Sequence, residues 1–291
     1  KSGKKEISGV DAFVLYDTYG FPAEMTAEMA KEKGLDVNMD EFKAEMEKQR
    51  ERGKQSWKGA DNAFETAMTE LAKVGGGTVF TGYTANESSA TVVAVSDGHS
   101  LVESLHEGQK GYVVLDQTPF YAEMGGQCGD TGVIEFDGEA LFVVEDTKKA
   151  SKTFVHHGYV KKGTIKTKES VRPKIDVVRR SLIKGNHSAT HLLQAALREV
   201  LGSHVKQAGS FVDAERLRFD FSHFEGMTAE QIGKVEQIVN ARIWENLPVT
   251  AQEMKIEDAL KTGAMAEFGE KYGELVRVVK MGDFSLEFCG G

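Results

Sequence analysis

Apolar residues recur at helical spacing in the first quarter of the chain. Residues 11–35 carry them at intervals of three or four, with a Gly-Phe-Pro break in the middle and a glycine near the end. Residues 39–54 place Phe42 and Met46 on one face among charged side chains. The pattern predicts a helical segment over residues 1–74 whose single apolar stripe packs against another element.

The period of the pattern changes after three consecutive glycines at 75–77. Short valine-rich runs follow, such as TVVAVSDG, GYVVLDQT and EALFVVED. Asp-Gly pairs at 97–98 and 137–138 punctuate these runs, as they do in hairpin turns. Several short strands within about ninety residues predict a small β-barrel or sandwich, which we place at residues 75–168.

Helices return in the last part of the chain and alternate with short strands. One helix is predicted over 176–201 and another over 228–245, where a Thr-x-x-Gln sequence forms a capping box. Strand-like runs at 216–223 and 275–288 interleave with them. The strands are short and mostly of hairpin type, so we predict an α+β fold rather than a doubly wound one, with a third domain over 169–291.

Composition narrows the class of protein. Apolar residues make up 40% of the 291 residues and charged residues 28%, as in soluble globular proteins. No run approaches the roughly 18 apolar residues of a membrane span, and no signal segment opens the chain, which favours the cytosol and argues against a membrane partner. The two cysteines are too few for a disulfide scaffold, so each is expected to be a free thiol or a metal ligand.

Charge is unevenly distributed. The net charge of −9 argues against a nucleic-acid-binding protein, but residues 148–184 hold twelve Lys and Arg against Glu169 and Asp176. A basic stripe on an acidic body can steer a phosphate backbone to one face. The alternative is an ordinary solvated surface run.

Two histidines four residues apart are the first candidate for chemistry. His187 and His191 are separated by about one helical turn, and they lie on the flank of the predicted helix rather than within its apolar stripe. That stripe consists of Leu192, Leu193, Ala196, Leu197 and Val200. This placement favours metal ligands, for which zinc is suited, over core histidines. Ser188 and Ala189 stand where zinc peptidases and nucleoside deaminases need a glutamate, so both classes are excluded.

A third ligand is expected from a cysteine. Cys289 follows a strand-like run and precedes two glycines that let the backbone approach an ion, whereas Cys128 in GGQCGD is interpreted as a small buried residue in a glycine-rich turn. His156 and His157 are adjacent and would face opposite sides of a strand. We expect the remaining histidines to be isolated surface or packing residues; these are His99, His106, His204 and His223.

Longer motifs carry a resemblance that spans almost the whole chain. NHSATHLLQAAL, HVKQAGSFV, LRFDFSHFEGMT and VRVVKMGDFSLEFCGG closely resemble the editing domain of bacterial alanyl-tRNA synthetases. LDQTPFYAEMGGQCGDTG resembles the glycine-rich loop of that family, and DAFVLYDTYGFPAEMT resembles the segment joining its tRNA-recognising helices to the editing module. The chain opens without methionine and stops directly after a strand-like run, so we expect an internal piece of a longer protein.

The resemblance implies a zinc site. Two histidines of an HxxxH motif and the cysteine of a Cys-Gly-Gly-Thr-His motif bind zinc in that family, which corresponds to His187, His191 and Cys289. The fourth ligand would come two residues after Gly291, so we expect incomplete or absent metal in this chain. Four protein ligands resemble a structural site, which favours positioning of the substrate over activation of water.

The resemblance also implies residues that contact the substrate. Thr190 is implied to sense the amino-acid side chain and Gln207 to contact the substrate, both at the catalytic site. Gly125, Gly126 and Gln127 are expected to bind substrate at the mouth of the pocket, with a plain strand-connecting loop as the alternative.

The implied reaction is hydrolysis of the ester of seryl- or glycyl-tRNA for alanine. A pocket shaped for alanine discriminates against one methyl or one hydroxyl by only about 1–3 kcal/mol, so a second site must remove the errors. The acceptor end of the tRNA is expected beside residues 148–184. The parent protein would join alanine to tRNA with ATP and Mg²⁺, but nothing in this chain resembles that site. Alternatives are a free-standing deacylase, which would lack the N-terminal helices, a non-catalytic RNA-binding module and a structural zinc domain.

Overall fold

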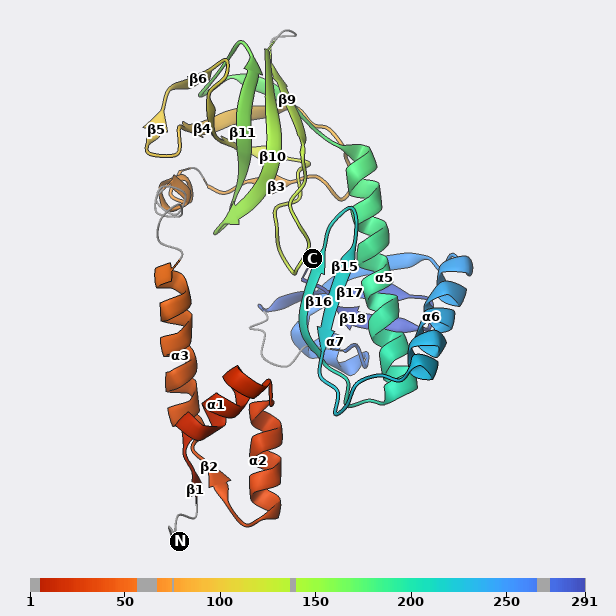
Figure 1. Cartoon of the computed structure of the whole chain (residues 1–291). Coiled ribbons are helices and arrows are strands. Elements are labelled where there is room, and N and C mark those ends of the chain that lie inside the picture. The colour runs from red at the N-terminus through yellow and green to blue at the C-terminus, as the bar shows by residue number, and fades with distance from the viewer. Residues whose placement is uncertain (1–5, 57–66, 75, 137–139, 266–272, 291) are drawn as a thin grey trace. The chain divides into compact units, whose positions relative to one another are not determined.

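The protein divides into two compact units, residues 1–65 and 66–291. The computed structural model describes residues 6–56, 67–74, 76–136, 140–265 and 273–290. The mixture of helices and several small sheets confirms the α+β class (Figure 1). None of the helices in these described ranges is both long and apolar enough to cross a membrane.

The first unit is built from three helices, α1 (Gly9–Tyr19), α2 (Ala23–Glu32) and α3 (Met39–Ser56). A short parallel pair is formed by β1 (Glu6–Ile7), which precedes α1, and β2 (Asp36–Val37), which precedes α3. Gly20 ends α1 with a φ of 67°, a left-handed conformation that glycine adopts without strain. Phe42 packs with Ala12 and Ala23, and Met46 lies against the same cluster, as the predicted stripe requires.

The predicted boundary at 74/75 falls beside Gly75, which lies outside the described residues. Residues 67–71 are helical, and Leu71 is fully buried against Ala94, Val114 and Val155 of the second unit. By its contacts this helical turn therefore belongs with the strands that follow it rather than with the first three helices.

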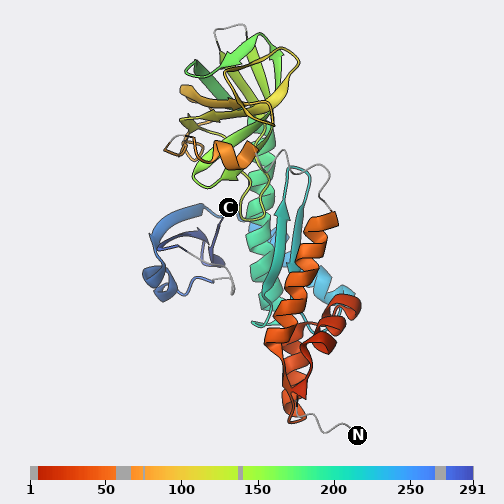
Figure 2. The same ribbon diagram turned by 90° about the vertical axis from the view of Figure 1, so that its left-hand side faces the viewer.

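A seven-stranded sheet opens the second unit (Figure 2). Its strand order is β13-β9-β10-β11-β7-β4-β5, and β13 also pairs with β4. The strands are β4 (Ala90–Ser96), β5 (Leu101–Val102), β7 (Lys110–Leu115), β9 (Gly132–Phe136), β10 (Ala140–Ala150), β11 (Thr153–Lys162) and β13 (Ser170–Ile175). Short pairs flank this sheet: β3 (Val79–Phe80) with β8 (Gln117–Thr118), and β6 (Ser104–His106) with β12 (Thr164–Lys166). Alternate residues point inward and form one apolar core around Phe120 and Phe142.

One described hairpin turn of this sheet lies at the Asp-Gly pair that predicted it. Asp97 accepts hydrogen bonds from the amides of His99 and Ser100 between β4 and β5, and Gly98 has a φ of 94°. The second predicted turn, at 137–138, lies outside the described residues, but β9 and β10 on either side of it pair antiparallel.

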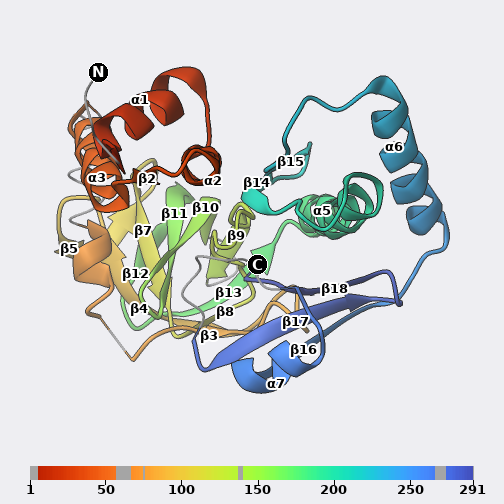
Figure 3. The same ribbon diagram turned by 90° about the horizontal axis from the view of Figure 1, so that it is seen from below.

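A 25-residue helix, α5 (Val177–Leu201), leads from the seven-stranded sheet into the rest of the unit (Figure 2). Asp176 caps it by accepting a hydrogen bond from the Arg179 amide. Figure 3 looks nearly along α5 and shows β14 (Gln207–Val212), β15 (Leu217–Phe221) and α6 (Ala229–Trp244) around it. The predicted capping box of Thr228 and Gln231 is present at the start of α6.

The last sheet is antiparallel and three-stranded. It contains β16 (Val249–Lys255), β17 (Leu275–Met281) and β18 (Ser285–Phe288), and α7 (Ile256–Lys261) packs against it. Leu192 of α5 contacts Val279 and Met281 of this sheet, so one face of the helix lies over its strands. The site described next forms along that contact.

Candidate metal centre

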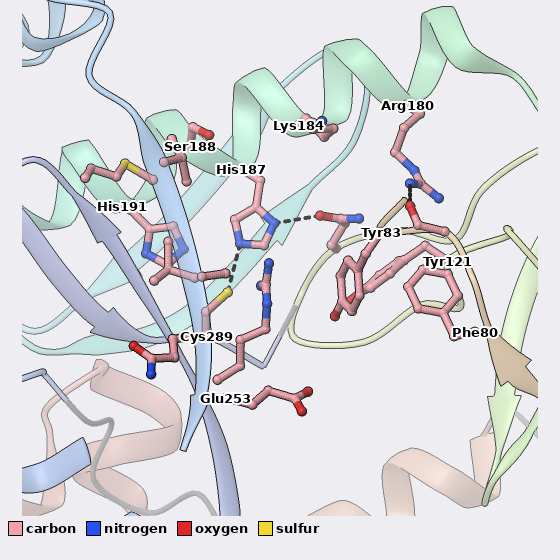
Figure 4. A pocket seen from close by; sticks show the side chains of 18 residues that line it. Phe80, Tyr83, Tyr121, Arg180, Lys184, His187, Ser188, His191, Glu253 and Cys289 are labelled. Carbon is pink, nitrogen blue, oxygen red and sulfur yellow. Dashed lines mark hydrogen bonds between the residues drawn. The ribbon is translucent and has the colours of Figure 1, made fainter. Parts of the chain in front are cut away.

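The three candidate ligands come together. His187 and His191 lie one turn apart on α5 with ring centroids 5.1 Å apart, and Cys289 follows β18 (Figure 4). Their donor atoms lie within 4.8 Å of one another, and Cys289 Sγ is 3.2 Å from His187 Nε2. Residues a hundred positions apart in sequence thus form a single cluster.

The fold fixes the cysteine opposite the helix. The Cys289 amide donates a hydrogen bond of 2.9 Å to the Arg277 carbonyl, so the backbone stays paired with β17 beyond the end of β18. The side chain packs with Leu192, Val279 and Met281, and it is 9% exposed. The thiol is therefore held inside the protein and faces the histidines.

Each histidine is held by a second side chain. His187 Nδ1 lies 2.6 Å from Gln127 Oε1, and His191 Nδ1 lies 2.5 Å from Glu287 Oε2. His191 Nε2 is buried and has no hydrogen-bond partner among the described residues. With its Nδ1 engaged, His187 directs Nε2 at Cys289, as the dashed line in Figure 4 shows.

Electrostatics favours the metal-binding form of the cysteine. Burial raises the pKa of the Cys289 thiol, but His187 and His191 outweigh burial and lower that pKa from 9.0 to about 5. Burial lowers the pKa of His191, but Cys289 and Glu287 outweigh it and raise that pKa from 6.5 to about 9. At neutral pH these two shifts favour a Cys289 thiolate beside a protonated His191, and a metal ion that bound both groups would displace the His191 proton.

The donor set suits zinc. Two imidazole nitrogens and a thiolate are typical zinc ligands. In the neutral ring with Nδ1 protonated, the buried Nε2 of His191, which lacks a hydrogen-bond partner among the described residues, has a lone pair for a metal ion. These residues therefore fit the ion that the resemblance implies.

A cavity of about 810 Å³ adjoins the cluster, a size typical of ligand sites. One face of α5 lines it with Lys184, Ser188 and the two histidines, and β16 and β17 contribute the opposite wall. Phe80, Tyr83 and Tyr121, which come from segments around the seven-stranded sheet, line the remaining side (Figure 4). The cavity therefore has one end formed by the candidate metal ligands and another formed by aromatic side chains.

Comparison with known proteins identifies the family to which the chain belongs. The family model for tRNA synthetases of class II (A) matches residues 1–179. The chain belongs to this family. It is 50% identical over 286 residues to the alanine–tRNA ligase of Pseudomonas fluorescens, which covers 98% of the chain and 32% of that protein. It is 46% identical over 291 residues to that of Staphylococcus saprophyticus, which covers 100% of the chain and 33% of that protein. The chain spans about a third of the length of these curated relatives.

In this class II synthetase chain, neither Thr190 nor Gln207 is among the residues that line the cavity beside the cluster. Thr190 is 6% exposed and donates a hydrogen bond of 2.9 Å to the Asn186 carbonyl. Gln207 is half-buried and begins β14 opposite Phe221.

The glycine-rich loop docks on β14. Gln127 lines the cavity, and the Gly126 carbonyl accepts a hydrogen bond of 2.8 Å from the Val212 amide. Gly126 has a φ of 77°, and a Cβ there would lie 2.6 Å from the Ser210 carbonyl oxygen. Gly125 lies beside Gly290, whose added Cβ would be 3.9 Å from the Gly125 Cα. The loop thus reaches the cluster with its third residue, Gln127.

The other thiol and the other histidines lie outside the cluster. Cys128 Sγ accepts a hydrogen bond of 3.3 Å from Arg179, and burial raises its pKa. His156 is fully buried between Thr118 and Val113 in the seven-stranded sheet. The prediction that His204 and His223 are isolated is wrong: His204 Nε2 lies 2.9 Å from His223 Nδ1, and their rings stack.

Ion pairs neutralise part of the positive charge of the basic stretch 148–184. Acidic partners neutralise several of its cations: Lys148 pairs with Glu123 and Asp146, Arg172 and Lys174 with Glu135, and Arg180 with Asp130. Arg180 and Lys184 line the cavity. The local charge is therefore smaller than a residue count indicates.

Sequence reasoning missed Glu287 and the aromatic end of the cavity. A signal for Glu287 existed, because it precedes Cys289 by two positions and side chains two apart on a strand share a face. Tyr83 and Arg277 have no such local signal; the Arg277 guanidinium lies 5.1 Å from the Tyr83 ring centroid only because β17 passes near that loop.

Proposed function

We propose that this chain is the editing portion of an alanine–tRNA ligase and hydrolyses the ester of seryl- or glycyl-tRNA for alanine. The supporting observation is the cluster of His187, His191 and Cys289 at one end of a cavity, in a chain related throughout its length to alanine–tRNA ligases. The parent protein would attach alanine with ATP and Mg²⁺ at a site outside these residues.

Zinc is the proposed metal, held by His187 Nε2, His191 Nε2 and Cys289 Sγ. When bound, it supplies a positive charge that orients substrate oxygen atoms at this end of the cavity. Gln127 and Glu287 hold the two histidine rings, and Leu192, Val279 and Met281 pack around the Cys289 side chain. The site then presents the ester for attack by water.

Selectivity for serine is proposed to come from Thr190. Its hydroxyl hydrogen is used by the Asn186 carbonyl, but a hydroxyl oxygen also has lone pairs that accept hydrogen bonds. The serine hydroxyl would donate to this buried oxygen, whereas the alanine methyl cannot. Leaving a buried polar group unpaired costs about 1–3 kcal/mol, which favours the mischarged ester. Gln207 and the glycine-rich loop are proposed to contact the rest of the substrate.

The aromatic end of the cavity suits the terminal nucleotide of the tRNA. Tyr83 is 60% exposed, with the Arg277 guanidinium near its ring and the Phe80 ring 4.9 Å away. Nucleobases stack on aromatic rings and on guanidinium planes. Lys184, on the same face of α5 as the two histidines, can contact a phosphate. We propose that residues 148–184 contact the acceptor end of the tRNA mainly through Lys184.

The test compares two mischarged substrates. Thr190→Val removes the hydroxyl at nearly constant volume, so serine release from seryl-tRNA should fall about 5- to 150-fold, whereas glycine release should change little because glycine has no hydroxyl. Equal losses for the two substrates, or no loss for either, would remove the assigned role of Thr190. A chain that binds mischarged tRNA and zinc but releases no amino acid would instead be a tRNA-binding module.

A further inference from the structure

Two buried side chains hydrogen-bond the two candidate histidine ligands. We infer that Gln127 and Glu287 are positioning residues that fix the ligating nitrogen of His187 and of His191. This inference rests on the proposed metal site and is independent of the proposed ester hydrolysis.

Glu287 holds His191 from the strand that also leads to the cysteine. It is 3% exposed, and its Oε2 lies 2.5 Å from His191 Nδ1. Pairing of Glu287 with Val279 fixes the strand register, so the carboxylate and the Cys289 thiol reach the helix together. Donation of the Nδ1 hydrogen to the carboxylate places the lone pair of the neutral ring on Nε2, the nitrogen left for a metal ion.

Gln127 holds His187 from a different part of the unit. It lies in the loop between β8 and β9, 60 positions before the histidine, and it is 6% exposed. The loop is docked by hydrogen bonds on both sides of Gln127: Val212 donates to the Gly126 carbonyl, and Cys128 donates to the Val212 carbonyl. The orientation of one ligand therefore depends on a loop that belongs to the seven-stranded sheet.

Gly126 controls whether this loop reaches the site. Its φ of 77° is strained for any other residue, and an added Cβ would lie 2.6 Å from the Ser210 carbonyl oxygen, which belongs to rigid backbone. A side chain at Gly126 would push the loop off β14 and withdraw the Gln127 amide from His187. Zinc affinity should therefore fall without any change to a ligand or to Gln127 itself.

The experiment measures the zinc dissociation constant by competition with a chelator, in the absence of tRNA. Loss of a side chain that orients a metal-binding histidine weakens metal binding about 10- to 100-fold. We expect this loss in Gln127→Leu, in Glu287→Leu and in Gly126→Ala. Gln127→Glu and Glu287→Gln keep an oxygen acceptor at the same chain length, so they should restore zinc affinity to within a few-fold of the unmodified protein.

A matched control separates positioning from loss of a buried polar group. Gln194→Leu removes another glutamine of 6% exposure, whose amide on α5 donates to the Met265 sulfur and not to a ligand. Its zinc affinity should be unchanged. In the cobalt-substituted protein, the leucine variants at Gln127 and Glu287 should also alter the absorption bands of the metal, whereas Gln194→Leu should not.

Three results would overturn the inference. One is unchanged zinc affinity and unchanged cobalt spectra in the folded Gln127→Leu and Glu287→Leu proteins. Another is an equal loss in Gln194→Leu. If Gln127 serves only to contact the substrate, zinc affinity stays constant while KM for mischarged tRNA rises. Failure of the unmodified protein to bind zinc would overturn the metal site itself.

Discussion

The strongest prediction about the stability of the second unit, which carries the site, concerns Arg180. Its guanidinium bonds both carboxylate oxygens of Asp130, with Nε 2.9 and 3.0 Å from them, and it also donates to the carbonyls of Gly82 and Pro119, each at 3.0 Å. The Asp130 side chain is only 2% exposed. Arg180→Met would leave this carboxylate buried with the Tyr121 amide as its remaining hydrogen-bond donor, together with two unsatisfied carbonyls. Removing one partner of a buried ion pair costs about 3–5 kcal/mol.

The assay is urea unfolding of the unmodified chain and of two arginine variants. Arg172→Met is the matched control, because Arg172 also pairs with a carboxylate, at 2.6 Å from Glu135, but its side chain is 56% exposed. We expect Arg180→Met to lower the free energy of unfolding by about 3 kcal/mol or more, with an unchanged dependence on urea, and Arg172→Met to change it little. A loss in Arg180→Met no larger than that in Arg172→Met would refute the reasoning.

Three further predictions concern pH, substrate and metal. Burial lowers the pKa of His156 from 6.5 to about 4, so the stabilising contribution of the neutral ring is complete above pH 6.5. This contribution, up to about 3 kcal/mol, is lost as pH falls toward 4. His156→Gln should flatten this part of a plot of unfolding free energy against pH, and an unchanged slope would show that His156 is not the group responsible. Tyr83→Ala should raise KM for mischarged tRNA about 5- to 100-fold while Tyr83→Phe leaves it nearly unchanged, and equal KM values would exclude stacking. Zinc at a hundred times its dissociation constant should stabilise the second unit by about 2.7 kcal/mol in urea unfolding, and no increase would argue against binding to the native state.

Local signals in the sequence predicted local structure. The capping box at Thr228 and Gln231 and the hairpin turn at Asp97 depend on residues within three positions of one another, so spacing alone identifies them. The flank position of His187 and His191 on α5 follows from helical periodicity in the same way. Their meeting with Cys289 did not follow from periodicity; it was expected because two glycines follow this cysteine after a strand-like run, and the resemblance implied the same ligand.

Contacts between distant segments were not predictable. The pairing of Glu287 with His191, of Gln127 with His187 and of His204 with His223 depends on how strands and loops meet in three dimensions. The charge of residues 148–184 was overestimated for the same reason, because the acidic partners of those cations come from other strands and loops. A count of charges cannot show which of them are neutralised.

The most direct test of the central claim is the rate of serine release from mischarged seryl-tRNA for alanine by the zinc-loaded chain and by its Cys289→Ala variant. We expect release above the spontaneous rate by the zinc-loaded chain, and loss of that release in the folded variant. A folded, zinc-loaded chain that releases no serine would contradict the proposed editing function, as would release that does not depend on Cys289.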